Sequence, residues 1–432
     1  MELGYNDKLF LFTSKGDKAA VVEFHCVLDV PVILEKLKEA VRMTLNRFPY
    51  FRVRPFLDEK NDALIFEENT SEVPVFAVEG SIKEYFHFGS DETNGYLFCV
   101  YAYEKENAFT VAASHVIGDV RGEFFFMRLL MYYYLKLSGC EVDPALVPYS
   151  EADNLDESAY ENFCDACEKI QAVPDEADNT TPEPAFKIPE NPVYSGTAYT
   201  RDFAVVWKNS EMLNAVHSLE TSFVCFVNAV IAEAIYRNYD VQNKIIAAGV
   251  PVDMRDMMHS KSQLNFTNNI TLNYESSYAS MSMKEKTQLL RSQLKAKTKL
   301  NNLAAGAKGW NSMLDAVMKM PLNEQIKIFE SMYKYVMRTF LLSNIGAVKF
   351  PDDIQAHLKD FMMYLTNLED TPAYFLISQG ENGMLLACQN YDDTKILESI
   401  CDILKDYGVK AEVVDKGKFQ TCRLNIERFS KK

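Results

Sequence analysis

A cluster of prolines near the middle of the chain limits the folds that are open to it. Acidic and polar residues surround the five members of this cluster, which are Pro174, Pro182, Pro184, Pro189 and Pro192. Because proline fixes φ and lacks a backbone N–H, repeated proline excludes a regular helix or a central strand. We therefore predict that residues 173–195 are an exposed linker between an N-terminal lobe, residues 1–172, and a C-terminal lobe, residues 196–432. The total of 432 residues allows two or three domains of ordinary size.

Strand-like and helix-like patterns occur in both halves. Short apolar and alternating runs predict strands at residues 9–12, 21–28, 96–103, 108–113, 199–206, 245–250 and 270–274. Helical patterns cover residues 29–48, 122–138, 222–239, 283–300 and 392–406. The dipeptide Asn382-Gly383 between two apolar runs predicts a hairpin near the end of the chain. Mixed elements in both halves predict an α/β (α+β) fold.

The charge balance narrows the classes of function. The formal net charge is −16, which argues against a nucleic-acid binder because phosphate neutralisation needs a basic surface. The same charge disfavours binding to an anionic membrane. We see no signal peptide and no uninterrupted apolar stretch of membrane-spanning length. Nine cysteines, an odd number at irregular spacing, suit a reducing compartment, and we expect a cytoplasmic protein.

Motifs for metals and nucleotide cofactors are missing from the sequence. We find no metal-ligand spacing, Walker loop or GxGxxG, so zinc, nucleotide hydrolysis and dinucleotide chemistry have no support. Cys164 and Cys167 form an isolated CxxC pair. We interpret this pair as two helix residues at chance spacing rather than a redox or metal site.

A histidine and an aspartate four residues apart form the most informative local pattern. His115 and Asp119 lie at the junction of a predicted strand, residues 108–113, and a predicted helix, residues 122–138. A histidine at a strand end beside a turn is held rigidly, is partly shielded from water and has a pKa near neutrality. Those properties suit a general base. A hydrogen-bonded histidine in an ordinary turn is the alternative, because this spacing also arises by chance.

The order of four short segments resembles one family. The segments are residues 45–52 (LNRFPYFR), His115–Asp119, Val252–Arg255 (VDMR) and Ser343–Gly346 (SNIG). In this order they are similar to segments of the coenzyme-A-dependent acyltransferases of the chloramphenicol acetyltransferase fold. That group includes alcohol acetyltransferases, plant-type HxxxD acyltransferases and peptide-synthetase condensation domains. The resemblance implies two lobes, each a mixed β-sheet with flanking helices, and a tunnel between them. It also implies acyl transfer from acyl-CoA, or from a pantetheine carrier, to a hydroxyl or amine.

The resemblance further implies roles for single residues. His115 would be the general base, midway along the tunnel. Asp119 would point away from the substrate and pair with Arg255, which gives both residues a structural role in the site. Ser343 or Asn344 would donate a hydrogen bond to the oxyanion, and we favour Ser343 because a hydroxyl rotates to follow the moving oxygen.

Four more positions belong to the motif or the channel that the resemblance implies. Ser114 and Val120 stand where condensation domains have a histidine and a glycine, and Gly118 lies within the motif. Asn269 precedes a strand that lines the channel in similar proteins, although a turn role fits it equally well. Valine at position 120 adds a side chain where glycine leaves room for a pantetheine arm. An acyltransferase-like fold without catalysis, which binds a ligand or docks a carrier protein, is therefore an alternative.

The resemblance implies no tightly bound cofactor, because the coenzyme A thioester is a substrate and a small-molecule alcohol or amine is its acceptor. Arg291, Lys295 and Lys299 recur every four residues on a predicted helix and form a basic face for the phosphates of CoA. An ordinary solvated helix face is an equal alternative. A condensation enzyme that requires an acyl carrier protein is a third hypothesis. Two lobes in one chain complete a site without oligomerisation, so we expect a monomer.

Overall fold

The computed structural model describes residues 5–14, 19–79, 86–171, 184–189, 199–334, 338–366, 371–389, 393–420 and 424. Most of the linker predicted at residues 173–195 therefore lies outside the described residues. Its described part runs beside the second half of the chain. There Ala185 forms a bridge with Ile245, and the Phe186 N–H donates to the Ile245 carbonyl.

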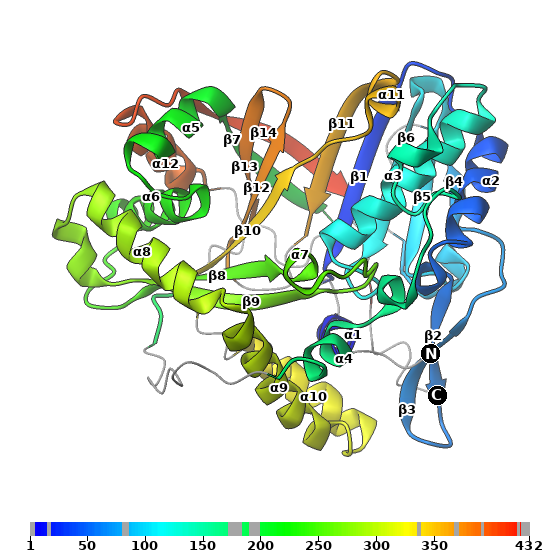
Figure 1. Cartoon of the computed structure of the whole chain (residues 1–432), viewed down its shortest axis with the longest axis horizontal. Coiled ribbons are helices and arrows are strands. Elements are labelled where there is room, and N and C mark those ends of the chain that lie inside the picture. The colour runs from blue at the N-terminus through cyan, green and yellow to red at the C-terminus, as the bar shows by residue number, and fades with distance from the viewer. Residues whose placement is uncertain are drawn as a thin grey trace.

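Five strands form the first sheet, in the order β11 (Leu358–Leu365), β1 (Val21–Leu28), β6 (Ala108–Ser114), β5 (Phe98–Tyr103) and β4 (Val75–Ala77). Figure 1 shows this sheet together with its two helices, α2 (Leu34–Leu45) and α3 (Val120–Leu137). Phe24 of β1 contacts Phe124 of α3. Because side chains alternate along a strand, Glu23 and His25 face away from α3. A separate hairpin joins β2 (Val53–Asp58) to β3 (Ala63–Glu68).

Seven strands form the second sheet, in the order β14 (Ala411–Gln420), β7 (Tyr199–Lys208), β13 (Asn382–Gln389), β12 (Ala373–Gln379), β10 (Phe340–Ala347), β8 (Ile246–Asp253) and β9 (Thr267–Tyr274). The helices beside it are α5 (Asn209–Ser218), α6 (Phe223–Asn238), α12 (Lys395–Lys405) and, along β9, α8 (Met283–Lys297) (Figure 1). The side chains of Phe375 on β12 and Leu386 on β13 face away from these helices and belong to the apolar core of the first sheet. The prediction of a mixed α/β fold with two sheets and flanking helices is confirmed.

Sheet membership does not follow the two halves of the chain. β11 lies in the second half of the sequence but pairs antiparallel with β1, with Val22 opposite Leu365 and Cys26 opposite Phe361. The ring of Phe361 lies near that of Phe24, at a centroid distance of 6.1 Å, so β11 extends the apolar face that α3 covers. The predicted C-terminal lobe, residues 196–432, therefore supplies one strand of the first sheet, which a division by chain position does not anticipate.

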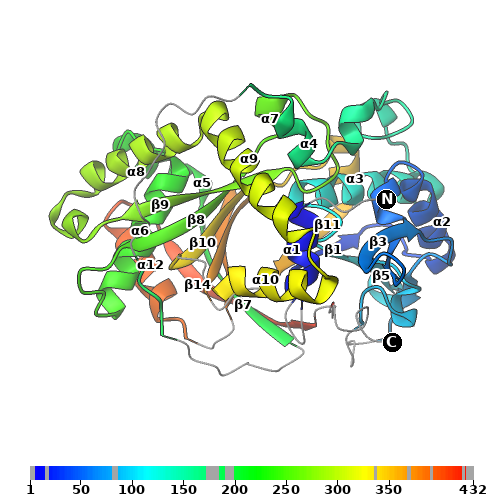
Figure 2. The ribbon, with the colours of Figure 1, turned by 90° about the horizontal axis from the view of Figure 1, so that it is seen from below.

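The first described segment is a helix. Residues 9–12 were expected to form a strand, and this expectation is wrong, because they lie in α1 (Tyr5–Thr13). A run of four apolar residues is too short to separate a buried strand from a buried helix. Phe12 is buried and packs edge-on against Phe329 at a centroid distance of 5.2 Å. Figure 2 shows α1 beside two helices that the sequence patterns also missed, α9 (Leu300–Val317) and α10 (Leu322–Lys334).

Among the described residues, no helix taken alone has both the length and the apolar character to cross a bilayer. The neighbours α5 and α6 meet that test by length and composition only when they are taken as a pair, and the chain bends by 90° between them.

Candidate active site

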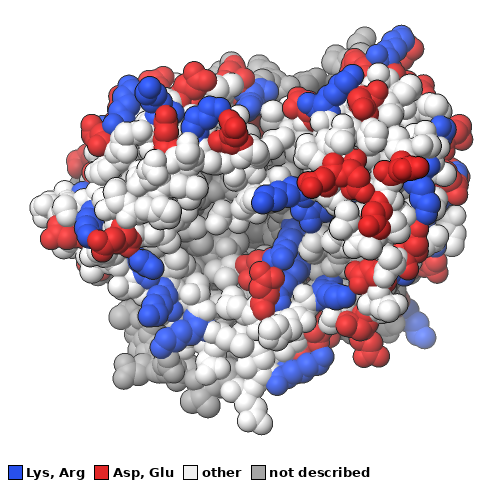
Figure 3. Space-filling view, turned by 45° about the horizontal axis from the view of Figure 1, so that its top comes forward, with Lys and Arg blue, Asp and Glu red and all other residues white. Residues whose placement is uncertain are grey.

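The surface of the molecule is hollowed between its two sides. Figure 3 shows the hollow between the side that carries α3 and the side that carries α5, α6 and α8. Lys and Arg side chains, together with acidic ones, line the wall nearer α3. The turn that leads into α3 contains the His115–Asp119 motif.

His115 directly follows β6, where the strand ends and the turn before α3 begins. Its backbone N–H donates to the carbonyl of Ala20 at 3.0 Å, which ties this turn to the segment before β1. Its ring stacks on the ring of Phe10 from α1, at a centroid distance of 4.1 Å and an angle of 20°. The residue is partly buried. These contacts fix the position of the imidazole without enclosing it completely.

Asn265 is the polar partner of the His115 ring, and sequence reasoning missed it. Nδ1 of His115 lies 2.9 Å from Oδ1 of Asn265. Nδ2 of Asn265 donates to the His115 carbonyl at 2.9 Å and to Oδ1 of Asp7 at 3.0 Å. Asn265 and Asp7 are both buried. The chain separations are 150 residues for the His115–Asn265 contact and 258 for the Asn265–Asp7 contact, so no local spacing signalled either one.

The surroundings of His115 favour its neutral form. Burial lowers the pKa of the imidazole below its usual value. The negative charge of Asp119, a hydrogen bond of the ring to its own backbone and the hydrogen bond to Asn265 act in the opposite direction but do not cancel the effect of burial. A neutral imidazole at pH 7 is able to accept a proton, as a general base must.

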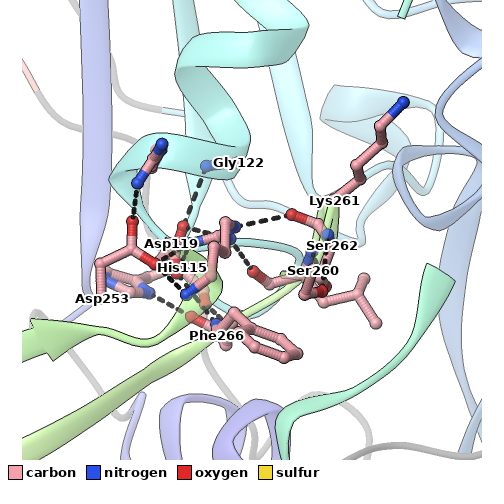
Figure 4. A network of polar contacts seen from close by, with 12 residues as sticks. His115, Asp119, Gly122, Asp253, Ser260, Lys261, Ser262 and Phe266 are labelled. Atoms are coloured by element: carbon pink, nitrogen blue, oxygen red, sulfur yellow. Dashed lines mark hydrogen bonds and ion pairs between the residues drawn. The ribbon is translucent and has the colours of Figure 1, made fainter. Parts of the chain in front are cut away.

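Asp119 and Arg255 form a bidentate ion pair beside His115 (Figure 4). The two hydrogen bonds are both 2.8 Å long, and the side chains are only 5% and 2% exposed. Asp119 also accepts from the N–H of Gly122, which caps α3, and from the N–H of Phe266, each at 2.9 Å. Burial alone raises the pKa of Asp119, but the charge and hydrogen bonds of Arg255 outweigh it and hold the pKa below its ordinary value.

Arg255 connects the motif turn to a loop of the second half. It is the first residue of α7 (Arg255–Met258), and its Nε donates to the carbonyl of Ser262 at 2.7 Å. Its Nη2 also donates to the carbonyl of Leu264 at 2.6 Å. Because Asn265 and Phe266 follow immediately, this one guanidinium positions the loop that contacts both His115 and Asp119. We refer to the Asp119–Arg255 pair with these bonds as the clamp.

The close backbone approach in this motif occurs at Gly122. A Cβ at Gly122 would lie 2.2 Å from the carbonyl oxygen of Gln263, a distance that real side chains do not reach. At Gly118 the corresponding distance to the same oxygen is 3.2 Å. Val120 is the first residue of α3 and is partly exposed. The chain therefore has valine where condensation domains have glycine, and its own sterically required glycine lies two residues later.

Ser343 and Asn344 lie on β10 of the second sheet. Ser343 is partly buried and pairs with Phe375, whose side chain points toward the core of the first sheet. Asn344 is exposed. No contact that the described residues make joins either one to His115, so their role as oxyanion donors stays a prediction. Asn269 is exposed and lies opposite Pro251 in the β8–β9 register.

Ser114 is the last residue of β6 and is buried. Its hydroxyl accepts from the N–H of Val116 at 3.4 Å, a contact within the motif turn. Ser114 therefore contributes to the turn geometry that presents His115.

The basic face predicted at Arg291, Lys295 and Lys299 lies on α8 and just beyond it. All three residues are exposed, and Arg291 donates to the carbonyl of Glu220 at 2.7 Å. Figure 1 shows α8 along β9, the outermost strand on its side of the second sheet. That this basic face binds the phosphates of CoA stays a prediction.

A different arginine lies on the helix that begins at the motif turn. Arg128 of α3 stacks over the ring of Phe124, with its guanidinium carbon 4.2 Å from the centroid, and donates to the carbonyl of Lys349. Its Nε is buried without a hydrogen-bond partner. Burial and then the charge of Arg121 lower the pKa of Arg128 to about 10. Arg121 itself pairs with Asp253 at 2.6 Å. Arg128 is therefore charged at pH 7, and its Nε–H makes no hydrogen bond.

The CxxC pair lies on α4 (Phe163–Glu168), where burial raises the pKa of both Cys164 and Cys167 to about 12. Thiols with such pKa values are weak nucleophiles at neutral pH. Within the described ranges, no group of three or more His, Cys, Asp or Glu side chains is arranged to hold a metal ion.

Comparisons with known proteins agree with this architecture. No protein-family model matches the sequence, and a search of curated proteins found no match. Among solved structures, polyketide synthase associated protein 5 from Mycobacterium tuberculosis superposes with a TM-score of 0.61 at 11% identity, over 94% of this chain and 96% of that one. The chain therefore shares the overall fold of that protein. The resemblance drawn from the four short segments is confirmed at the level of the fold.

Two further solved structures support the same conclusion. TRI101 from F. graminearum, complexed with coenzyme A and deoxynivalenol, has a TM-score of 0.59 at 11% identity, over 95% of this chain and 99% of that one. TRI3 trichothecene 15-O-acetyltransferase from Fusarium sporotrichioides has a TM-score of 0.55 at 14% identity, over 94% and 95%. Each alignment spans both lobes, so the likeness covers the whole architecture and not a single sheet.

Proposed function

We propose that this chain is an acyltransferase that moves an acyl group from acyl-CoA, or from a pantetheine carrier, to a hydroxyl or amine. The observation that carries the proposal is the setting of His115. A partly buried, neutral imidazole follows β6 at the motif turn, and the clamp holds that turn in place. TRI101, which has the same fold, was solved in complex with coenzyme A and deoxynivalenol. The fold and the base together favour acyl transfer over other uses of a histidine.

The proposed reaction has two proton transfers, from the acceptor to His115 and from His115 to the leaving thiolate. His115 takes the proton of the acceptor O–H or N–H as the acceptor atom bonds to the thioester carbonyl carbon. The carbonyl electron pair shifts to oxygen, and Ser343 is the proposed donor to that oxyanion, with Asn344 as the second candidate. When the carbonyl re-forms, the C–S bond breaks, and the imidazolium returns its proton to the sulfur of the leaving CoA. Asp119 and Arg255 touch neither substrate and act by holding the turn.

The donor requires positive charge for its phosphates. The predicted face at Arg291, Lys295 and Lys299 is one candidate. Arg128 is a second, because it lies on the same helix that begins at the motif turn and has an unpartnered buried Nε. A guanidinium is more weakly hydrated than an ammonium and presents a planar fork of donors that matches phosphate oxygens.

The test is release of free thiol from a panel of acyl-CoA thioesters mixed with alcohols and amines. We expect release by the wild type and a fall of roughly 10²–10⁴-fold in kcat for His115→Ala. His217→Ala is the matched control, because His217 is exposed on α5 and should leave the rate unchanged. Because the pKa of His115 is lowered, the acid limb of the pH–rate profile should have its midpoint below 6.5. Equal release by the wild type and His115→Ala would refute the proposal.

A carrier-dependent condensation enzyme is the second candidate. The starter condensation domain of rhizomide synthetase RzmA has a TM-score of 0.53 with this chain at 10% identity, over 91% of this chain. This candidate predicts no release from free acyl-CoA and release from an acylated carrier protein, again dependent on His115. An inactive module would show neither.

A further inference from the structure

The amide of Asn265 can be oriented without ambiguity. One of its terminal atoms contacts the His115 carbonyl oxygen at 2.9 Å and a carboxylate oxygen of Asp7 at 3.0 Å. Both of those atoms are acceptors, so the atom between them must be the NH₂ group. The carbonyl oxygen of the amide therefore faces Nδ1 of His115 at 2.9 Å. Since an amide oxygen only accepts, Nδ1 must carry a hydrogen, and in the neutral ring Nε2 keeps the free lone pair.

We infer that Asn265 and Asp7 are positioning residues that select the tautomer of His115, so that Nε2 is the basic nitrogen. This inference rests on the proposed function, because a fixed tautomer matters only if the ring takes up a proton. Asp7 orients the amide of Asn265, and this amide orients the imidazole of His115, which takes the proton of the substrate. The same amide also donates to the main chain of His115, so it sets both the tautomer and the ring position.

Asp119, the aspartate of the motif, does not orient the His115 ring, because other groups occupy its carboxylate. Both oxygens of Asp119 accept from Arg255, and they also accept from the N–H groups of Gly122 and Phe266. Among the described residues, no hydrogen bond joins Asp119 to the His115 ring. An amide oxygen orients an imidazole without placing a full negative charge against it.

The N-terminal helix is therefore part of the site. α1 supplies Asp7 to the amide and Phe10 to one face of the imidazole. It is anchored at its other end, where Phe12 packs against Phe329 of α10. A helix whose residues 9–12 were expected to form a strand thus contributes Phe10, which contacts the base, and Asp7, which contacts the partner of the base.

The first test reads the tautomer directly. The full chain is labelled with ¹⁵N-histidine, and the His115 signals are assigned by their loss in His115→Ala. Above the pKa of His115 we expect a protonated Nδ1 and an unprotonated Nε2 in the wild type, and a mixture of tautomers in Asn265→Ala. A protonated Nε2 in the wild type, or an unchanged ring in Asn265→Ala, would overturn the inference.

The second test separates positioning from folding. In the thiol-release assay we expect Asn265→Ala to lower kcat about 10–100-fold, the range typical of outer-shell partners, with a much smaller change in KM. Asn268→Ala is the matched control, because that amide also donates to a backbone carbonyl, that of Leu303 at 2.9 Å, and should leave kcat unchanged. Asp7→Asn keeps an oxygen for Asn265 and should retain most activity, whereas Asp7→Leu should not.

The outcomes also distinguish the inference from the function on which it rests. If the wild type releases no thiol from any donor, the proposed function fails, while the NMR measurement still reports the tautomer. If the wild type is active and Asn265→Ala keeps its kcat, or loses no more than Asn268→Ala, the positioning role fails and the proposed function stands. Thermal unfolding of each variant shows that the comparison is made between folded proteins.

Discussion

Two regions of the molecule bury carboxyl groups to the same extent and leave them in opposite states. Asp119 of the clamp is 3% exposed and Asp202 of β7 is 0% exposed. Asp119 accepts four hydrogen bonds, two of them from Arg255, and its pKa is lowered. Both oxygens of Asp202 are buried without a partner, and burial raises its pKa well above the ordinary value. Burial sets the cost of a charge, and the partners decide whether the charge is kept.

The second region lies between the two sheets. Glu23 of β1 is 5% exposed, and burial raises its pKa to about 8. Its charge is the second cause that raises the pKa of Asp202, so the two carboxyl groups interact across the sheets. At neutral pH this region therefore holds protonated acids, whereas the clamp holds an ion pair. Two arginines differ in a similar way. Arg255 forms an ion pair with Asp119, whereas Arg128 of α3 has no carboxylate partner among the described residues.

The largest effect is expected from breaking the clamp. Arg255→Met leaves Asp119 buried without its cation and should lower the free energy of unfolding by about 3–5 kcal/mol, measured by urea denaturation. Arg121→Met is the control, because the Arg121 side chain is 44% exposed and its pair with Asp253 should be worth less than about 1 kcal/mol. Equal losses in the two variants would contradict the distinction between the clamp and a surface pair.

A change of opposite sign is expected in the second region. As pH rises from 4.5 toward 8, unfolded Glu23 loses its proton while folded Glu23 keeps it, so the wild type loses stability across this window. The loss is about 1.4 kcal/mol per pH unit. Glu23→Gln has no carboxyl group to ionise and should not lose stability over this pH range. It should be more stable than the wild type by about 3 kcal/mol at pH 7, with little difference at pH 4.5.

The control for this change is Glu59→Gln, because Glu59 is exposed and its substitution should give the same stability difference at both pH values. Urea denaturation at pH 4.5 and pH 7 measures both variants. A gain by Glu23→Gln that does not depend on pH would mean that improved packing, and not the cost of the buried charge, is its cause.

The smallest effect tests the arginines. If the spare donors of Arg128 contact the donor phosphates, Arg128→Ala should raise KM for acyl-CoA about tenfold, which corresponds to about 1.4 kcal/mol, with a smaller change in kcat. Arg291→Ala, on the exposed face of α8, should change KM less. Steady-state kinetics on both variants decides between the two basic sites, and a larger effect at Arg291 would favour the face predicted from sequence.

The sequence indicated the parts of the site that follow from local order. His115 and Asp119 lie at a strand-to-helix junction, and Arg255 falls in a segment that resembles a family motif, so the sequence alone points to all three. Asn265 and Asp7 were missed because their contacts span 150 and 258 residues and no spacing encodes them. The helix at residues 5–13 was missed because four consecutive apolar residues fit a buried strand equally well.

The topology was predictable only in outline. Alternating elements gave the α/β class, but β11 joins the first sheet from the second half, and such a pairing has no signature in the strand itself. The steric need for glycine at position 122 arises from a carbonyl of Gln263, a contact that no single-sequence pattern reports.

The strand that β11 contributes has a consequence for how the protein is assembled. Without it, the edge of β1 would present a row of unsatisfied backbone groups, which in isolation invites aggregation. A fragment that ends before the linker is therefore expected to be insoluble, and a ribosome must synthesise more than 360 residues before the first sheet can close. The first sheet is therefore completed only after most of the chain has been made.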